Sequence, residues 1–152
     1  MRSFLLVLAL ALPAVVGTAG AQVSVVPIRD LAFGPVIVGV SSNVPPSHPI
    51  RSGQFQLTAP LTTRVRLRLT MPYRLDGPAG ASLPINFSNN DAVLMGTAPN
   101  SQPSTFNPKG AAVQLIVTSA TTNVWVGGTV TPAGNQAQGT YTGTITLTVT
   151  VL

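Results

Sequence analysis

Residues 139–152 read GTYTGTITLTVTVL, and their alternation is the strongest structural signal in the chain. Every even position from 140 to 150 is Thr. Because successive side chains of a β-strand point to opposite faces, the pattern predicts one long strand with an apolar row on a core and a hydroxyl row toward solvent. Threonine favours such a half-buried strand over a helix. We expect other polypeptide to cover the apolar row, which consists of Gly139, Tyr141, Gly143, Ile145, Leu147, Val149 and Val151.

The rest of the chain also predicts an all-β protein. Its 14 Gly and 14 Pro residues separate short segments that are apolar or alternating, as in a sandwich or a barrel. No segment after residue 21 has the 3.6-residue period of an amphipathic helix. We therefore expect residues 22–152 to form one domain, an immunoglobulin-like antiparallel β-sandwich of about seven to nine strands.

Turn residues set the expected bounds of the other strands. The Gly127-Gly128 pair inside the expected strand 123–130 indicates a bulge or a close approach of two backbones. The Pro-containing stretch from Thr97 to Gly110 predicts a long surface loop. Phe106 would either anchor a ligand on this loop or fold onto the sandwich. The expected strands are 22–28, 36–40, 53–58, 64–71, 82–87, 111–118 and 123–130.

The N-terminal residues predict export. Arg2 precedes an apolar run from Phe4 to Val16, and Ala19-Gly20-Ala21 fits a cleavage site. The run is shorter than the roughly 20 residues that span a bilayer. Residues 1–21 are therefore expected to be a signal peptide, with an uncleaved anchor as the alternative. We expect the protein in the periplasm, at the cell surface or outside the cell, with no transmembrane segment after cleavage.

The composition offers little for catalysis or metal binding. His48 is the only His, Cys and Glu are absent, and there are three Asp residues. A catalytic site needs a paired acid and base, an activated nucleophile or a metal cage, so Asp30 and His48 with a Ser would be the one formal grouping. Residues 89–91, Asn-Asn-Asp, lack the acids of a calcium loop. We expect no enzymatic activity, no metal and no cofactor.

Charge and cysteine content narrow the possible partners. The pI near 11.3 reflects how few groups titrate, and a net charge of +5 is modest, so nucleic acid is not expected as a partner. An exported protein without cysteine has no disulfides and depends on its core or on partners for stability.

Residues 64–71 carry a basic strand face. Arg64, Arg66 and Arg68 alternate with apolar residues and would lie about 7 Å apart on one side of the strand. One interpretation is a binding site for acidic glycan, lipid headgroups or an acidic protein. The other is a solvated face that also discourages pairing at a sheet edge. The opposite face, with Val65, Leu67 and Leu69, is expected to point inward.

Several segments resemble a family of secreted bacterial domains, domain of unknown function 4402. One is DLAFG at residues 30–34, followed by Gly39. The others are SGQF at 52–55, VGGTV at 126–130, and GTYTGT at 139–144 with the alternating end. The family has no assigned activity, so the resemblance implies a fold and not a function.

The C-terminal stretch is also similar to that of chaperone-usher pilins and spore coat protein U domains. In that group a Gly lies fourteenth from the end and the penultimate residue is aromatic; here Gly139 keeps the first feature and Val151 replaces the second. The resemblance implies an incomplete sandwich whose groove is filled by a strand from a periplasmic chaperone or another copy. The only candidate donor in this chain is 22–29, interrupted by Pro27, which could instead complete its own sandwich.

Together these observations favour an exported structural or surface-assembly protein, fimbria-like or coat-like. The alternative is an adhesin-like binding module that recognises glycan or an acidic surface. It would use either the Thr97–Gly110 loop or the face of Arg64, Arg66 and Arg68.

Overall fold

A computed structural model describes residues 22–152, and the predicted signal peptide lies outside this range. The described chain forms twelve β-strands and one 3₁₀ turn, η1 (Pro78–Gly80). The strands are β1 (Ser24–Arg29), β2 (Ser42–Val44), β3 (Gly53–Thr58), β4 (Arg64–Thr70), β5 (Arg74–Asp76), β6 (Ser82–Asn86), β7 (Ala92–Gly96), β8 (Ser104–Phe106), β9 (Val113–Ile116), β10 (Thr121–Val126), β11 (Gly128–Val130) and β12 (Thr146–Val151).

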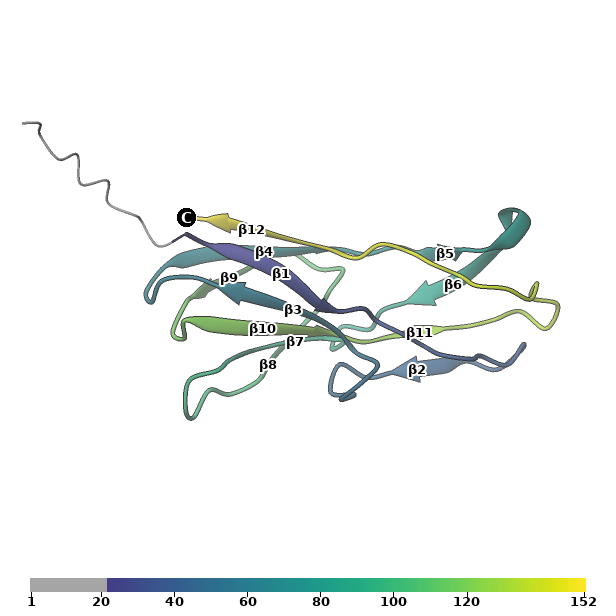
Figure 1. The fold of residues 1–152 in the computed structure, drawn as a ribbon, viewed down its shortest axis with the longest axis horizontal. Helices are drawn as coiled ribbons and strands as arrows, with labels where there is room; N and C mark the ends of the chain where they lie inside the picture. The colour runs from purple at the N-terminus through teal and green to yellow at the C-terminus, as the bar shows by residue number, and fades with distance from the viewer. Residues whose placement is uncertain (1–21) are drawn as a thin grey trace, which may run out of the picture.

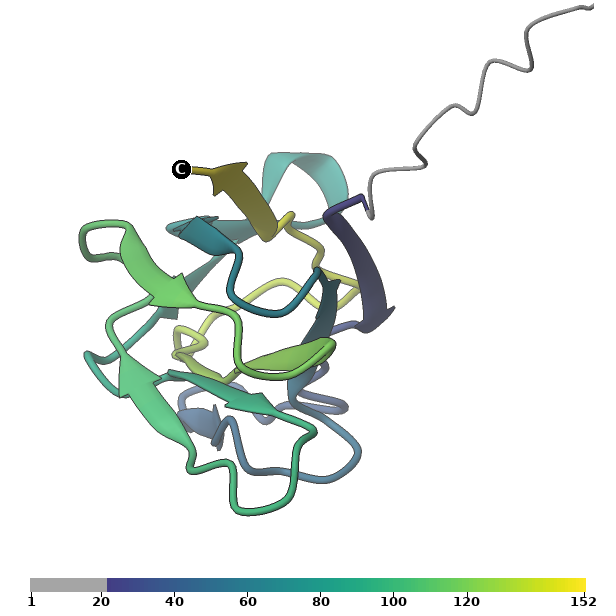
Figure 2. The same cartoon turned by 90° about the vertical axis from the view of Figure 1, so that its left-hand side faces the viewer.

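The strands form three antiparallel sheets arranged as a sandwich. One layer is the five-stranded sheet β1-β3-β10-β7-β8, and the three-stranded sheet β12-β4-β9 faces it. In the four-stranded sheet β2-β11-β6-β5, β11 continues β10 and β5 continues β4, so this sheet joins the two layers at one end of the long axis (Figure 1). Figure 2 looks along that axis and shows the layers around the core. The predicted all-β sandwich is confirmed. The strands β2, β5, β7 and β8 were not expected, and β11 is a separate part of the expected strand 123–130.

The core consists of two adjoining apolar clusters, one centred on Phe87 and Ile85 and the other on Leu57 and Val124. The side chain of Phe106 contacts both clusters from β8, which pairs with β7. The stretch from Thr97 to Gly110 is therefore not the uninterrupted loop that its prolines predicted. Of the two roles considered for Phe106, the structure shows the one in which it folds onto the sandwich.

Residues 36–40 do not form the expected strand. The chain turns there, Gly39 has φ +73°, and its N–H donates to the carbonyl of Pro132 (3.2 Å). A β-branched sequence favours a strand only where a neighbouring sheet buries its side chains, and no strand pairs with this segment. Val36 packs against the core, but the other apolar side chains stay exposed, with 70% of Ile37, 48% of Val38 and 53% of Val40 accessible to solvent.

The expected strand 123–130 is split between two sheets. β10 ends at Val126, the chain crosses at Gly127, and β11 begins at Gly128 in the adjoining sheet. A Cβ on Gly127 would overlap the backbone of residues 44–46. The predicted close approach of two backbones is confirmed, and it is what allows the crossing.

The C-terminal strand is shorter than predicted. β12 covers only Thr146–Val151, and before it a single pair of hydrogen bonds joins Thr142 to Asp76 (N–O distances 2.7 and 2.9 Å). The ladder stops because β4 ends at Thr70 and Pro72 has no N–H to donate. The predicted outward face is confirmed, and the predicted inward face is confirmed for four of its seven residues, since Gly139, Gly143 and Val151 are exposed. All even positions from 140 to 150 are exposed, whereas Tyr141, Ile145, Leu147 and Val149 are half-buried and pack against the core.

Candidate functional site

β12 is an edge strand, and its outer side has no strand partner among residues 22–152. It pairs only with β4, in a register that places Leu147 opposite Leu69 and Val149 opposite Leu67. In the facing layer β1 is also an edge strand, because it pairs only with β3. The two edges lie along the same side of the sandwich, which we call the seam (Figures 1 and 2).

One hydrogen bond shows which backbone groups of β12 point into the seam. The N–H of Leu152 donates to the carbonyl of Arg64 in β4 (2.9 Å). Because hydrogen bonding alternates between successive residues of an antiparallel strand, the threonines of β12 direct their N–H and C=O groups at β4. The intervening residues Leu147, Val149 and Val151 therefore direct theirs outward. They form a ladder edge to which another strand could pair.

A groove of about 550 Å³ lies in the seam and reaches the core. Its walls are Leu31, Phe33 and Val36 from the segment after β1, and Tyr141 and Ile145 from the segment before β12. These wall side chains are half-buried, so apolar surface stays accessible from the seam. We call this cavity the seam groove; its floor is formed by the buried side chains of Leu83, Ile85, Val126 and Val130.

Close packing fixes the wall formed by residues 139–145. The ring of Tyr141 lies where a side chain on Gly77 would be. The Tyr141 hydroxyl donates to the carbonyl of Ala137 (2.7 Å) and accepts from Nε2 of Gln136 (2.6 Å). Gly139 has φ +147° and packs against Pro78, a position where a Cβ would be both strained and obstructed. The glycines in the predicted apolar row thus permit close approach.

The apolar row of β12 is only partly covered by the described chain. Val151 is 55% exposed, although its partner across the ladder, Val65, is completely buried. The N-terminal segment does not pair with β12, because β1 pairs with β3 in the facing layer, where Val23 and Val25 pack against the same core cluster as Val149. The segment 22–29 thus joins its own sandwich through β3 and does not fill the edge beside the C-terminal strand.

The basic face lies on the other side of the same sheet. Arg64, Arg66 and Arg68 are exposed on β4, and the residues between them are buried, as predicted. However, β4 is the middle strand of β12-β4-β9. The interpretation that these arginines discourage pairing at an edge is wrong, because both sides of β4 are already paired.

The residues considered for catalysis and metal binding have local structural contacts. Nδ1 of His48 accepts the N–H groups of Ile50 (3.3 Å) and Arg51 (3.1 Å) and so closes a turn. The carboxylate of Asp91 accepts the N–H of Ser88 (2.6 Å). Within residues 22–152 no group of three His, Cys, Asp or Glu residues is placed to hold a metal ion. No helix in this part of the chain is long and apolar enough to cross a membrane.

Sequence reasoning missed a polar clamp at the rim of the seam groove. Nε and Nη2 of Arg29 donate to the carbonyl (2.7 Å) and hydroxyl (3.0 Å) of Ser52, whose hydroxyl donates to the carbonyl of His48 (2.7 Å). Ser52 is completely buried. In the sequence, Ser52 is only a small residue beside Gly53. Nothing there indicates that it contacts Arg29, which lies 23 positions away.

The seam groove was also missed, although its residues had been singled out for another reason. Each of the segments that carry the resemblance to domain of unknown function 4402 contributes to it. DLAFG at 30–34 and GTYTGT at 139–144 form opposite walls, and SGQF at 52–55 and VGGTV at 126–130 supply further lining residues. Segments far apart in the sequence thus converge on one cavity.

A family model described as Domain of unknown function (DUF4402) matches residues 15–151. The chain belongs to this family. The DUF4402 match spans the seam groove, β12 and β4. Comparison with curated proteins and with solved structures gives no match. The similarity to chaperone-usher pilins and spore coat protein U domains stays a prediction.

Proposed function

We propose that this DUF4402 protein is an exported structural subunit that assembles by accepting an extended segment of another polypeptide along the seam. The observation that carries the proposal is the combination of two features that adjoin along the seam. The backbone groups of Leu147, Val149 and Val151 point outward, and the seam groove opens the core next to the start of β12, where residues 139–145 form its wall. A strand that pairs with those groups and continues past the start of β12 would place side chains in the groove.

The gain from such an addition is sufficient for a stable joint. Full burial of one large apolar side chain contributes about 1.5–3 kcal/mol, so three alternate side chains would contribute roughly 5–9 kcal/mol. The added strand would also bury exposed apolar atoms of Val151, and its hydrogen bonds would replace those made to water. Ordering a flexible segment reduces this total, which favours a donor that is already extended.

The candidate donors are a periplasmic chaperone and a second copy of this chain. Both fit a protein that is exported to the periplasm or the cell surface. The proposal includes no catalytic step, since the groove is lined mainly by apolar side chains.

Residue-specific amide exchange of the purified protein, followed by NMR as its concentration is raised, tests the proposal. In the monomer we expect the amides of Leu147 and Val149 to exchange quickly and that of Thr148, bonded to β4, to exchange slowly. As oligomers form, the first two should become protected while Thr148 changes little. A protein that stays monomeric at all concentrations, alone and with candidate chaperones, would contradict the proposal.

A matched pair of variants sharpens this test. Val149→Pro removes an outward N–H without removing a bond to β4, so it should prevent strand addition while the monomer stays folded. Thr148→Ser, on the exposed face, should leave assembly unchanged. Light scattering after size-exclusion chromatography measures both, and normal oligomers of Val149→Pro would mean that assembly uses another surface.

A further inference from the structure

The outer face of the sheet β12-β4-β9 presents a straight row of cations flanked by polar side chains. We call Arg64, Arg66 and Arg68 the Arg row; its members are exposed and about 7 Å apart along β4. On the β12 side the register places Thr150 opposite Arg66 and Thr148 opposite Arg68. On the β9 side Gln114 lies opposite Arg66, and the exposed Ile116 lies opposite Arg64. Because paired residues point to the same face, hydroxyl and amide groups border the row.

The Arg row has no carboxylate partner among residues 22–152. Asp91 accepts the N–H of Ser88, and Asp30 lines the seam groove. The one ion pair in this part of the chain joins Asp76 to Arg74 (3.2 Å). Three neighbouring positive charges repel one another, and on a middle strand they protect no edge. A bound anion would relieve this repulsion.

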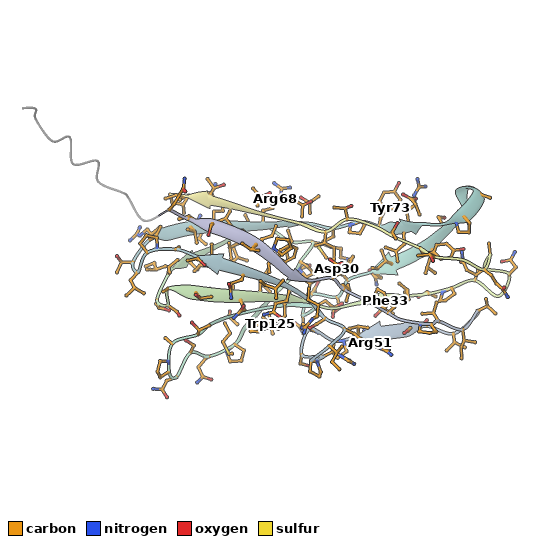
Figure 3. The ribbon with its side chains drawn as sticks, viewed as in Figure 1. Asp30, Phe33, Arg51, Arg68, Tyr73 and Trp125 are labelled. Atoms are coloured by element: carbon orange, nitrogen blue, oxygen red, sulfur yellow. The ribbon has the colours of Figure 1, made fainter. Side chains whose placement is uncertain are left out.

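The face continues beyond β4 to an exposed aromatic side chain. Tyr73, directly before β5, is 77% exposed, and Cζ of Arg74 lies 5.4 Å from the centre of its ring. Figure 3 shows Arg68 and Tyr73 projecting from the same side of the ribbon. A shallow depression of about 380 Å³ beside Tyr73 is also lined by Asp76, whose carboxylate is paired with Arg74, and by Thr142 and Thr144, which belong to the same exposed threonine series as Thr148.

We propose that this face binds an extended acidic polysaccharide, which would lie along the Arg row and end against Tyr73. Guanidinium groups bind carboxylates and sulfates with two parallel hydrogen bonds, and their even spacing along β4 fits an anion that repeats along a chain. The bordering threonines and Gln114 would bond to sugar hydroxyls. An exposed tyrosine ring gives a flat apolar surface for the face of a sugar ring.

This site is independent of the proposed assembly at the seam. A strand that pairs with β12 extends the sheet in its own plane and leaves the outer face uncovered. Binding to the Arg row should therefore occur in the monomer and in the assembled form. Loss of one activity without the other would separate the two proposals.

Binding of the full purified protein to immobilised polygalacturonic acid tests the inference, with neutral dextran as the uncharged control. The decisive comparison is between two double variants that lose the same charge: Arg66→Ser with Arg68→Ser on the row, and Arg51→Ser with Lys109→Ser elsewhere. We expect the first to weaken binding at least about tenfold, because two charge-assisted contacts are lost. The second should change it less than about threefold, through the long-range field alone.

Two further measurements complete the design. Tyr73→Ser should weaken binding to polygalacturonic acid, and all variants should keep the thermal unfolding midpoint of the parent protein. Equal losses in the two double variants would overturn the proposal, since binding would then depend on net charge alone. Equal or tighter binding to vesicles of anionic phospholipid, or to a single-stranded oligonucleotide, would overturn it in favour of those partners.

Discussion

Replacement of Leu147 by Asp tests how the C-terminal strand lies against the core. The side chain of Leu147 contacts both core clusters and lies opposite Leu69. Full burial of a leucine contributes about 1.5–3 kcal/mol, so the half-buried Leu147 accounts for about 1 kcal/mol. The new carboxylate would lose water on the side that faces the core, which costs a further penalty of about 1–3 kcal/mol. We expect Leu147→Asp to lower the free energy of unfolding by about 2–4 kcal/mol in total.

Thr146→Asp is the matched control. Residue 146 is the neighbour of Leu147 on the same strand, but it is exposed, lies opposite Thr70 and is diagonal to Arg68 on the outer face. We expect its effect to stay within about 0.5 kcal/mol. Urea unfolding followed by the fluorescence of Trp125, the only tryptophan, measures both variants at a concentration where the protein is monomeric.

The comparison can refute the reasoning in two ways. Equal losses in Leu147→Asp and Thr146→Asp would mean that the two faces of β12 are assigned incorrectly. A Leu147→Asp protein as stable as the parent would mean that the apolar row does not contact the core. In that case β12 would not lie on the core in the register described, and the outward edge on which the proposed assembly depends would lose its basis.

Two other predictions concern positions away from β12. Gly127→Ala should destabilise the protein by about 2 kcal/mol or more, because the new Cβ meets the backbone of residues 44–46, whereas Gly134→Ala, with open space around it, should be tolerated in the same urea experiment. Ser52→Ala should cost about 1 kcal/mol, since the bonds of the Ser52 hydroxyl to Nη2 of Arg29 and to the His48 carbonyl are lost, while the Ser52 carbonyl still accepts Nε of Arg29. The exposed Ser41→Ala is its control, and a Ser52→Ala protein of normal thermal stability would show that the Ser52 hydroxyl contributes nothing.

Local patterns predicted those features of the fold that depend on alternation. The inward and outward faces of β4 and β12 follow from a period of two, because a strand that borders a core must bury every second side chain. The crossing at Gly127 was also foreseeable, since a glycine pair inside a strand indicates close approach. These predictions needed no knowledge of which strands are neighbours.

The features that were missed depend on neighbours distant in the sequence. Residues 36–40 have the composition of a strand but find no partner. β12 begins only at Thr146 because of Pro72, which lies in a different part of the chain. The seam groove forms only when residues 30–36 and 139–145 come together, and the absence of an edge beside the Arg row depends on sheet order. No local periodicity contains that information.

The contact between Gly77 and the ring of Tyr141 restricts how this wall of the groove can diverge among relatives. Any side chain at position 77 would occupy the volume that the tyrosine ring fills. The two positions should therefore vary as a pair: lineages with a larger residue at 77 should carry a smaller one at 141, and lineages that keep the glycine should keep an aromatic ring. An alignment of DUF4402 sequences would reveal this correlated substitution.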